Sequence, residues 1–167
     1  MPEFAKENNT YEGRQVPMDT DAERYLLGGI LRDPNTISPA IEMIAEDDFF
    51  YLERHQLIWR AMKNLYSRGT AIDMLTLPAE LESMGKLREA GNREYIFDLM
   101  ESVASAANVE WNLEHLRNKH VLRKLIKMSS ETIKQAMDAT SSPDEVLQSA
   151  ERSVFAIAEK QVKNTLR

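Results

Sequence analysis

Hydrophobic positions recur at the spacing of an α-helix from residue 20 onward. The first stripe holds apolar or small residues at i, i+3, i+4, i+7 and i+8: Ala22, Tyr25, Leu26, Gly29 and Ile30. Thr20 and Glu23 frame a capping box, which predicts that their side chains satisfy two free backbone N–H groups at the helix start. Gly28 and Gly29 predict close contact with another helix; a phosphate-binding turn is disfavoured, because no strand precedes the pair.

Punctuating residues divide the next part of the chain into further helices. Ser38 as N-cap and Pro39 in the first turn predict the second helix. Three more are expected at about residues 53–68, 76–85 and 92–103. His55 lies on the buried stripe of the helix 53–68, and we interpret it as a hydrogen-bonded core residue rather than a metal ligand.

Two adjacent carboxylates precede two adjacent aromatic residues, in the order Asp47, Asp48, Phe49 and Phe50. Neighbouring carboxylates could suggest a metal site, but adjacent side chains diverge and no third ligand is evident from the sequence. We therefore interpret this segment as a solvated turn with aromatic anchors.

The last third of the chain predicts two long helices. Residues 109–139 contain no Gly or Pro, and a helix of roughly 30 residues would span about 45 Å. Ser142, Pro143 and Glu145 predict the start of the last helix through a second capping box. A short connection packs such helices antiparallel as a hairpin. Its predicted seam joins Ile126, Ser129, Ile133 and Ala136 or Met137 to Leu147, Ala150, Val154, Ile157 and Gln161.

Further apolar side chains of the hairpin fall outside this seam and are expected to stay partly exposed. Self-association would cover them; the alternative is that they fold back on the preceding helices. With Ile126 added from the seam, the expected partner interface is Leu122, Leu125, Ile126, Met128, Val146 and Phe155. The predicted fold class is all-α, with a compact multi-helix globule followed by a long antiparallel helical hairpin. The expected divisions are a disordered tail or cloning remnant at 1–16, the globule at 17–106, the hairpin at 107–160 and a linker start at 161–167.

Composition changes the picture mainly by exclusion. The 167 residues include no cysteine, so neither disulfides nor thiolate metal sites are available. No apolar run approaches the roughly 20 residues that cross a bilayer, and the first residues lack a hydrophobic signal core, which predicts a cytoplasmic protein. The net charge of −6 argues against a whole domain built to neutralise phosphates.

Catalytic and nucleotide-binding motifs are not found in the sequence. Gly85 and Lys86 form the one Gly-Lys pair, but Leu87 follows where a phosphate loop needs Ser or Thr. We therefore expect no catalytic, cofactor or metal site. A basic cluster on the long helix could contact a nucleic-acid backbone weakly, although a solvated or intersubunit face is favoured because no aromatic residues interleave it: Arg117, Lys119, Arg123, Lys124 and Lys127.

A series of short motifs resembles the N-terminal domain of the bacterial hexameric replicative DNA helicase, the DnaB type. The motifs cover about residues 17–160 in order: Pro17, Asp21-Ala22-Glu23 and Leu27-Gly28-Gly29-Ile30-Leu31; Asp48-Phe49-Phe50, His55, Ile58 and Trp59; Ile72-Asp73, Leu75-Thr76-Leu77, Leu81, Gly85 and Leu87; Asn108, Trp111 and Leu122-Arg123-Lys124-Leu125-Ile126; Ala150-Glu151, Val154-Phe155 and Ile157. The departures are local: Phe50 and Trp111 replace a usual Tyr, and residues 89–92 lack a second turn glycine.

This resemblance implies a collar domain rather than a motor. ATP and Mg²⁺ would bind in a RecA-like domain outside these 167 residues, so the chain is expected to be part of a longer protein. Hairpins of neighbouring copies would pair into a trimer of dimers on a hexamer, in the bacterial replisome at the nucleoid. Primase is the implied partner, a helicase loader is a further one, and DNA would be contacted only weakly or through the full ring. The alternatives are the helicase-binding domain of primase, which has a similar design, and a weak DNA-binding helical module.

Overall fold

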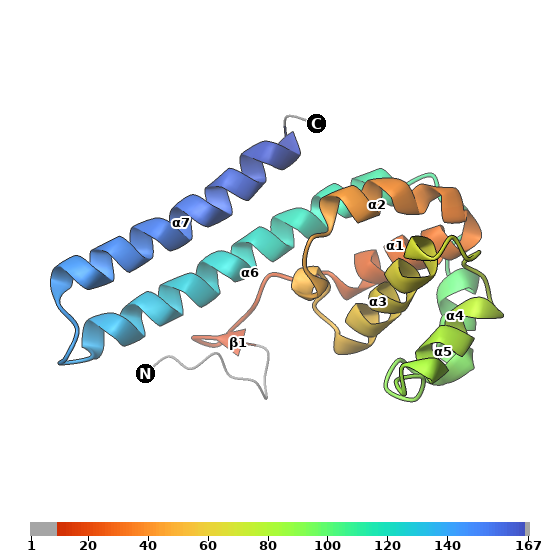
Figure 1. The fold of residues 1–167 in the computed structure, drawn as a ribbon, viewed down its shortest axis with the longest axis horizontal. Helices are drawn as coiled ribbons and strands as arrows, with labels where there is room; N and C mark the ends of the chain where they lie inside the picture. Colours follow the sequence, from red (N-terminus) through yellow and green to blue (C-terminus); the bar gives the residue numbers. More distant parts are fainter. Residues whose placement is uncertain (1–9, 166–167) are drawn as a thin grey trace. The chain divides into compact units, whose positions relative to one another are not determined.

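Helices make up most of the chain in a computed structural model that describes the backbone of residues 10–165 and the side chains of residues 11–161 (Figure 1). The elements are β1 (Thr10–Tyr11), β2 (Arg14–Gln15), α1 (Thr20–Arg32), the 3-10 turn η1 (Pro34–Thr36), α2 (Ile37–Met43), the 3-10 turn η2 (Asp47–Phe49), α3 (Glu53–Ser67), α4 (Thr76–Ser83), α5 (Asn92–Glu101), α6 (Val109–Met137) and α7 (Pro143–Thr165). The predicted all-α class is confirmed. No helix in the described part of the chain is both long and apolar enough to cross a membrane.

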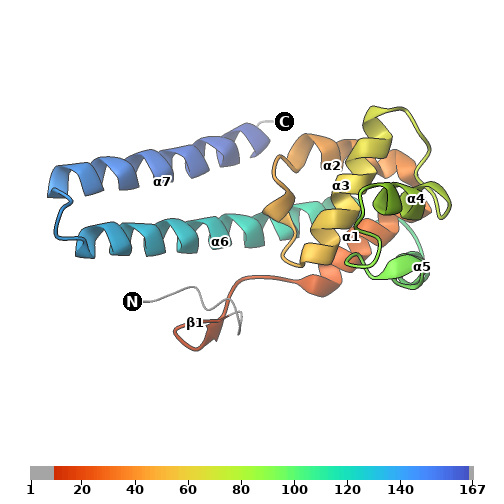
Figure 2. The ribbon, with the colours of Figure 1, turned by 60° about the horizontal axis from the view of Figure 1, so that its bottom comes forward.

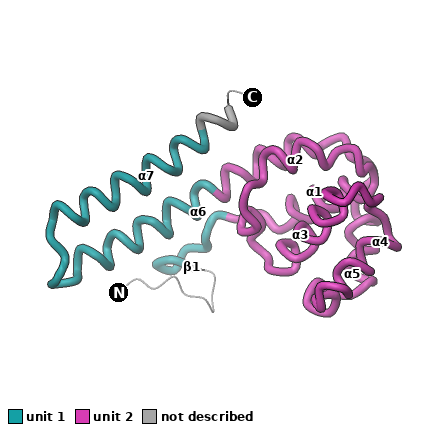
Figure 3. The backbone as a smooth tube through the Cα atoms, in the orientation of Figure 1, with its two compact units in different colours: residues 1–17, 121–167 teal, residues 18–120 magenta. Residues whose placement is uncertain are grey.

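The chain divides into two compact units (Figure 3). The globular unit comprises residues 18–120, and the hairpin unit comprises residues 1–17 together with 121–167. The division falls within α6, whereas the sequence placed this whole helix in the hairpin. The first part of α6 belongs to the globular unit because Val109, Leu113 and Leu116 are buried in its core.

The core of the globular unit is built from α1, α3, α4 and α5, with the first part of α6. Its largest fully buried side chains are Trp59, Phe50, Leu26, Leu27, Ile30, Ile58, Met62, Leu77, Leu81, Ile96, Leu99 and Leu113. Burying one such side chain contributes roughly 1.5–3 kcal/mol, so this cluster is the main source of the unit's stability. Phe49 and Phe50 are both buried, which confirms their predicted role as aromatic anchors of the turn.

The glycine pair of α1 lies against other helices, as predicted. A Cβ atom added at Gly28 would overlap the carbonyl oxygen of Leu99 and lie 2.6 Å from Cγ2 of Val103. A Cβ atom added at Gly29 would lie 2.8 Å from Cγ2 of Val109. Only glycine lets the backbone of α1 come this close to the end of α5, so the pair has a packing role.

The predicted capping box of α1 is wrong. Asp19, one residue earlier, is the N-cap, and its Oδ1 accepts a hydrogen bond of 2.9 Å from the backbone N–H of Ala22. Thr20 is the first residue inside the helix. Glu23 is fully buried and binds α3 instead of its own helix start, and Tyr25 of the predicted buried stripe is 49% exposed. A capping box needs the glutamate side chain to bond the N-cap N–H, and the Glu23 carboxylate is instead engaged by Tyr51, Leu52 and His55.

The start of α2 also differs from the sequence prediction, whereas α4 and α5 begin at the predicted residues. α2 begins at Ile37, so Ser38 lies inside it and is not its N-cap. At α4, the carboxylate of Asp73 accepts hydrogen bonds from Leu75 and Thr76, with distances of 2.9 and 2.8 Å. The backbone of Gly91, in the left-handed region at φ 101°, precedes α5 without a side-chain cap. Aspartate and serine can both cap, so the sequence alone does not choose between neighbouring candidates.

The hairpin unit begins with an ordered turn. β1 and β2 pair antiparallel, with Tyr11 opposite Arg14, and the connecting Glu12 and Gly13 both have positive φ, at 49° and 77°. Two consecutive residues with positive φ form the type of turn that favours a tight β-hairpin. Val16 is only 3% exposed. The prediction of a disordered tail is therefore wrong for residues 10–16, while residues 1–9 lie outside the described part of the chain.

The second part of α6 and α7 run antiparallel side by side, as predicted (Figures 1 and 2). The capping box of α7 is confirmed: Ser142 N–H donates to Glu145 Oε2 over 3.4 Å, and Glu145 N–H donates to Ser142 Oγ over 3.3 Å. Pro143 occupies the first helical position, where its missing N–H costs nothing.

Candidate interaction surface of the hairpin

The hairpin helices have little core of their own. No described side chain of α7 is buried, and none of α6 is buried beyond His120. One set of half-buried side chains recurs every three or four residues: Leu125, Met128, Thr132 and Gln135 on α6, and Val146, Ser149, Ala150, Ser153 and Ile157 on α7. These side chains form the seam between the two helices.

On α6 this seam lies one residue earlier than predicted at most positions, because Ser129, Ile133 and Ala136 are exposed while Ile126 is half-buried. On α7 the predicted seam residues Ala150, Ile157 and Gln161 are half-buried. Leu147 and Val154 were expected in the seam but are 67% and 45% exposed, and Ile133 is 36% exposed. Val146, expected outside the seam, is half-buried within it. One residue turns a helix by about 100°, and neighbouring faces of both helices carry apolar residues at the same 3-4 spacing. Periodicity therefore could not choose between these faces.

The exposed face of the hairpin carries an apolar stripe. Its members, which we call the hairpin stripe, are Leu122, Ile133, Met137, Leu147, Val154 and Phe155. Met137 and Phe155 are 70% and 68% exposed. Side chains of this size gathered on one helical pair are typical of a protein interface rather than of a solvated surface.

The expected partner-interface residues divide into two groups. Leu122 and Phe155 are exposed and belong to the hairpin stripe. The other members are half-buried between the hairpin helices: Leu125, Ile126, Met128 and Val146. The sequence analysis assigned the other members of the hairpin stripe to the seam: Ile133, Leu147, Val154 and, as the alternative to Ala136, Met137.

The predicted basic cluster does not form an exposed basic surface. Arg117 is 7% exposed and pairs with Glu114, with Nη2 and Oε1 2.5 Å apart. Arg123 is half-buried and donates a hydrogen bond of 2.9 Å to the carbonyl oxygen of Pro17. Lys119 and Lys124 are also half-buried, which leaves Lys127 as the exposed member. This arrangement disfavours the weak DNA contact that the sequence left open.

A buried polar network joins three helices of the globular unit. Oε2 of Glu23 accepts a hydrogen bond of 2.6 Å from the N–H of Tyr51, and Oε1 lies 2.8 Å from Nδ1 of His55. Nε2 of His55 lies 2.5 Å from the hydroxyl of Tyr95. Burial raises the pKa of Tyr95, against the opposing effect of nearby arginines, so its hydroxyl stays protonated as a donor. The network is structural, which confirms the prediction for His55.

A second histidine–carboxylate pair lies where α6 meets the start of α1. Nε2 of His115 lies 2.8 Å from Oδ2 of Asp19, and the ring of Trp111 stacks on His115 with centroids 4.8 Å apart. Burial raises the pKa of Asp19, but the Ala22 N–H and His115 outweigh this effect and hold the pKa below its usual value. Asp19 thus stays ionised as the cap of α1.

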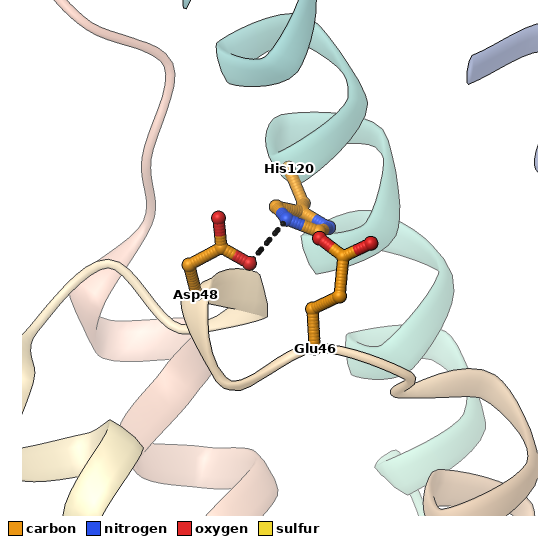
Figure 4. A group of neighbouring side chains, drawn as sticks. All are labelled: Glu46, Asp48 and His120. Carbon is orange, nitrogen blue, oxygen red and sulfur yellow. Dashed lines mark hydrogen bonds and ion pairs between the residues drawn. The ribbon is translucent and has the colours of Figure 1, made fainter. Parts of the chain in front are cut away.

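The turn η2 brings Asp48 to a third histidine (Figure 4). Nε2 of His120 lies 3.2 Å from Oδ1 of Asp48, and a carboxylate oxygen of Glu46 lies within 4.8 Å of the other two ligand atoms. No third ligand was evident from the sequence, and the structure brings a potential one, His120, to Asp48. The missed residue, His120, lies 72 positions away in the chain, so no local motif signals it.

Comparison with known proteins identifies the family. The model of the DnaB-like helicase N-terminal domain matches residues 15–118. Among similar proteins, the replicative DNA helicase DnaB of Buchnera aphidicola is 35% identical over 147 residues, which is 87% of this chain and 32% of that protein. The replicative DNA helicase DnaC of Bacillus subtilis is 32% identical over 152 residues, which is 91% of this chain and 33% of that protein. The chain thus spans about a third of the length of these relatives.

Solved structures agree with this result. The N-terminal domain of DnaB helicase from Mycobacterium tuberculosis superposes with a TM-score of 0.80 and 29% identity, covering 85% of this chain and 99% of that one. A DnaB-like replicative helicase, solved to show its interactions with primase, superposes with a TM-score of 0.70 over 85% of this chain and 31% of that one; at 23% identity it supports the fold alone. This chain belongs to the family of DnaB-like helicase N-terminal domains.

Proposed function

We propose that this chain is the non-catalytic collar of a replicative DNA helicase and that its hairpin drives assembly. The observation that carries the proposal is the hairpin stripe, exposed on helices in which no described side chain of α7, or of α6 beyond His120, is buried. A hairpin with so little core gains stability by packing its stripe against the hairpin of a second copy. Dimers formed in this way would assemble three at a time into a hexamer.

The strength of this contact can be bounded. Full burial of one large apolar side chain contributes roughly 1.5–3 kcal/mol. Association costs roughly 4–15 kcal/mol in lost translational and rotational freedom. The hairpin stripe offers six exposed side chains per copy, so the gain from their partial burial is of the same order as this cost. We therefore expect a concentration-dependent dimer, with further contacts in the full ring.

The rest of the proposed activity lies outside residues 1–167. Because the chain spans about a third of its relatives, ATP and Mg²⁺ would bind in the remainder of a longer protein, which would carry out unwinding. We also propose that the collar recruits primase, and a loader, within a bacterial replisome. This role is proposed from membership of the DnaB-like helicase N-terminal domain family; the structure of a DnaB-like replicative helicase and its interactions with primase shares the fold.

The alternatives are now less favoured. Membership of the helicase family removes the reason to regard the chain as the helicase-binding domain of primase. The DNA-binding alternative depended on a basic surface, and most members of that cluster are buried or half-buried. Neither alternative is proposed further.

Sedimentation velocity across micromolar concentrations tests assembly. We expect wild-type chain to shift from monomer toward dimer, and Leu122→Asp or Phe155→Asp to weaken the dimer by at least about tenfold, because a carboxylate would be buried at the interface. Gln148→Asp places the same charge on an exposed, polar position of α7 and should leave the dimer intact. A wild-type chain that stays monomeric throughout this range contradicts the proposal.

Titration with purified primase tests the second role. We expect saturable binding of primase to this chain, in the absence of DNA and nucleotide. If primase binds neither the isolated chain nor a full-length helicase that contains it, the proposal that this domain recruits primase is wrong. The assembly role is tested separately, by sedimentation.

A further inference from the structure

Three potential metal ligands converge within the globular unit. Glu46 and Asp48 belong to the turn around η2, and His120 lies on α6; all three side chains point toward one place (Figure 4). One ligand atom from each lies within 4.8 Å of the others. Within the described residues, this is the one group of its kind.

The spacing suits direct coordination after a small contraction. Two ligands bound at 2.0–2.2 Å in tetrahedral geometry lie roughly 3.4 Å apart. The separation of 3.2 Å between His120 Nε2 and Asp48 Oδ1 is close to that value. The remaining carboxylate has to move inward by about an ångström, which its position on a surface turn permits.

One of the three potential ligands is held rigidly and the other two can adjust, which favours a metal site. The side chain of His120 is 11% exposed, and its ring meets that of Phe49 edge to face with centroids 5.7 Å apart. This packing fixes the imidazole. The side chain of Asp48 is 58% exposed and that of Glu46 is half-buried, so both carboxylates can adjust to an ion. A fixed ligand with two adaptable ones is a suitable starting geometry.

The neighbouring carboxylate of Asp47 is directed at α3 rather than at His120. Asp47 contacts Lys63 Nζ at 2.7 Å and Arg60 Nη2 at 2.9 Å. Burial raises the pKa of Asp47, but hydrogen bonds from these two cations outweigh it and lower the pKa. Asp47 thus anchors the turn to α3 and leaves Asp48 directed at His120.

The other histidines of the chain show what the third ligand adds. His55 and His115 each pair with one carboxylate, that of Glu23 or Asp19. Glu23 is fully buried and accepts backbone N–H groups, and Asp19 is occupied in capping α1. His120 alone has two carboxylates within coordination reach.

We propose that Glu46, Asp48 and His120 bind a divalent transition-metal ion, with water completing its coordination. An imidazole ligand favours Zn²⁺ and its neighbours in the first transition row over Mg²⁺ and Ca²⁺, which prefer oxygen ligands alone. The ion joins the turn at η2 to α6 and therefore stabilises the globular unit. This inference is independent of the assembly proposed above.

Calorimetric titration of the untagged chain with ZnCl₂ at neutral pH tests the site. We expect saturable binding of one ion per chain, a rise in Tm with added Zn²⁺, and much weaker binding of MgCl₂ or CaCl₂. Glu46→Gln and Asp48→Asn keep size and alter exposed or half-buried positions, so they should fold normally. Each should weaken Zn²⁺ binding by at least the roughly tenfold that loss of a supporting residue causes at metal sites.

His115→Gln is the matched control, because it removes a histidine from the other pair on α6. It should leave the Zn²⁺ affinity unchanged, whereas His120→Gln should abolish saturable binding. Three results overturn the proposal: no saturable Zn²⁺ binding by wild-type chain, binding that Asp48→Asn and Glu46→Gln leave unaltered, or equal loss in His115→Gln. Glu46→Gln and Asp48→Asn test the site by themselves, so the proposal can be decided even if His120→Gln does not fold.

Discussion

At the scale of single residues, one buried carboxylate holds together much of the globular unit. Glu23 extends from α1 to the first backbone N–H groups before α3, whose N-cap position, Leu52, has no capping side chain. The same carboxylate bonds His55, whose far nitrogen reaches Tyr95 on α5. A fully buried carboxyl group is tolerated here because both of its oxygens take part in hydrogen bonds.

Replacing this carboxylate should therefore be costly. Glu23→Ala leaves His55 and the N–H groups of Tyr51 and Leu52 without an acceptor, and we expect a loss of about 3–5 kcal/mol in the free energy of unfolding. Urea denaturation followed by circular dichroism measures this loss in the free energy of unfolding. The control Glu89→Gln, at an exposed position of the same unit, should change stability by less than about 0.5 kcal/mol. A similar small change for both variants would show that the network contributes little.

At the scale of elements, backbone proximity sets the arrangement of α1 against its neighbours. The two glycines differ in what a side chain would meet: the backbone carbonyl of Leu99 at Gly28, and a methyl group of Val109 at Gly29. A carbonyl in a helix cannot move without shifting the helix, whereas a side chain can rotate. Helix packing also explains the wrong cap predictions. The residue that caps a helix is the one whose acceptor atom lies near the helix start in the folded chain.

This difference predicts an order of stabilities. Gly28→Ala should destabilise the globular unit by about 1–3 kcal/mol or more, since overlap outweighs the roughly 1 kcal/mol that alanine adds to a helix. Gly29→Ala should cost clearly less. Thermal and urea unfolding of both variants tests the order, and a Gly29→Ala variant that is the less stable would contradict it.

At the scale of the whole molecule, the two units differ in how much of their stability comes from the chain itself. The globular unit has a contiguous apolar core. The hairpin helices depend on half-buried seam residues and leave the hairpin stripe exposed. Local opening is easiest where few side chains are buried, so the hairpin should be the more dynamic unit in the monomer.

Hydrogen exchange can measure this difference. At low chain concentration, we expect amides of α7 to exchange much faster than those of α1 and α3. At concentrations where dimers form, protection should rise along α7 and the second part of α6, because association covers the hairpin stripe. Phe155→Asp should remove that rise, whereas Gln148→Asp should keep it. Protection of α7 that is independent of concentration in wild-type chain would contradict the expectation.

The sequence by itself determined the helical class, the approximate helix ranges and the antiparallel hairpin. These features follow from local periodicity, from breaks at Gly and Pro, and from the capping box of Ser142 and Glu145, whose groups lie within one helical turn. The buried role of His55 and the close approach at Gly28 were also predictable, because each follows from the face of a helix on which the residue lies.

Only the tertiary structure decided which residues meet across the chain. It selected Asp19 rather than Thr20 as the cap of α1, because Glu23 was needed at α3. It selected the hairpin seam between two neighbouring faces that periodicity makes nearly equivalent. It also brought His120 to Asp48. Such pairings depend on how elements pack, and a pattern within one element contains no information about the distant residue it will face.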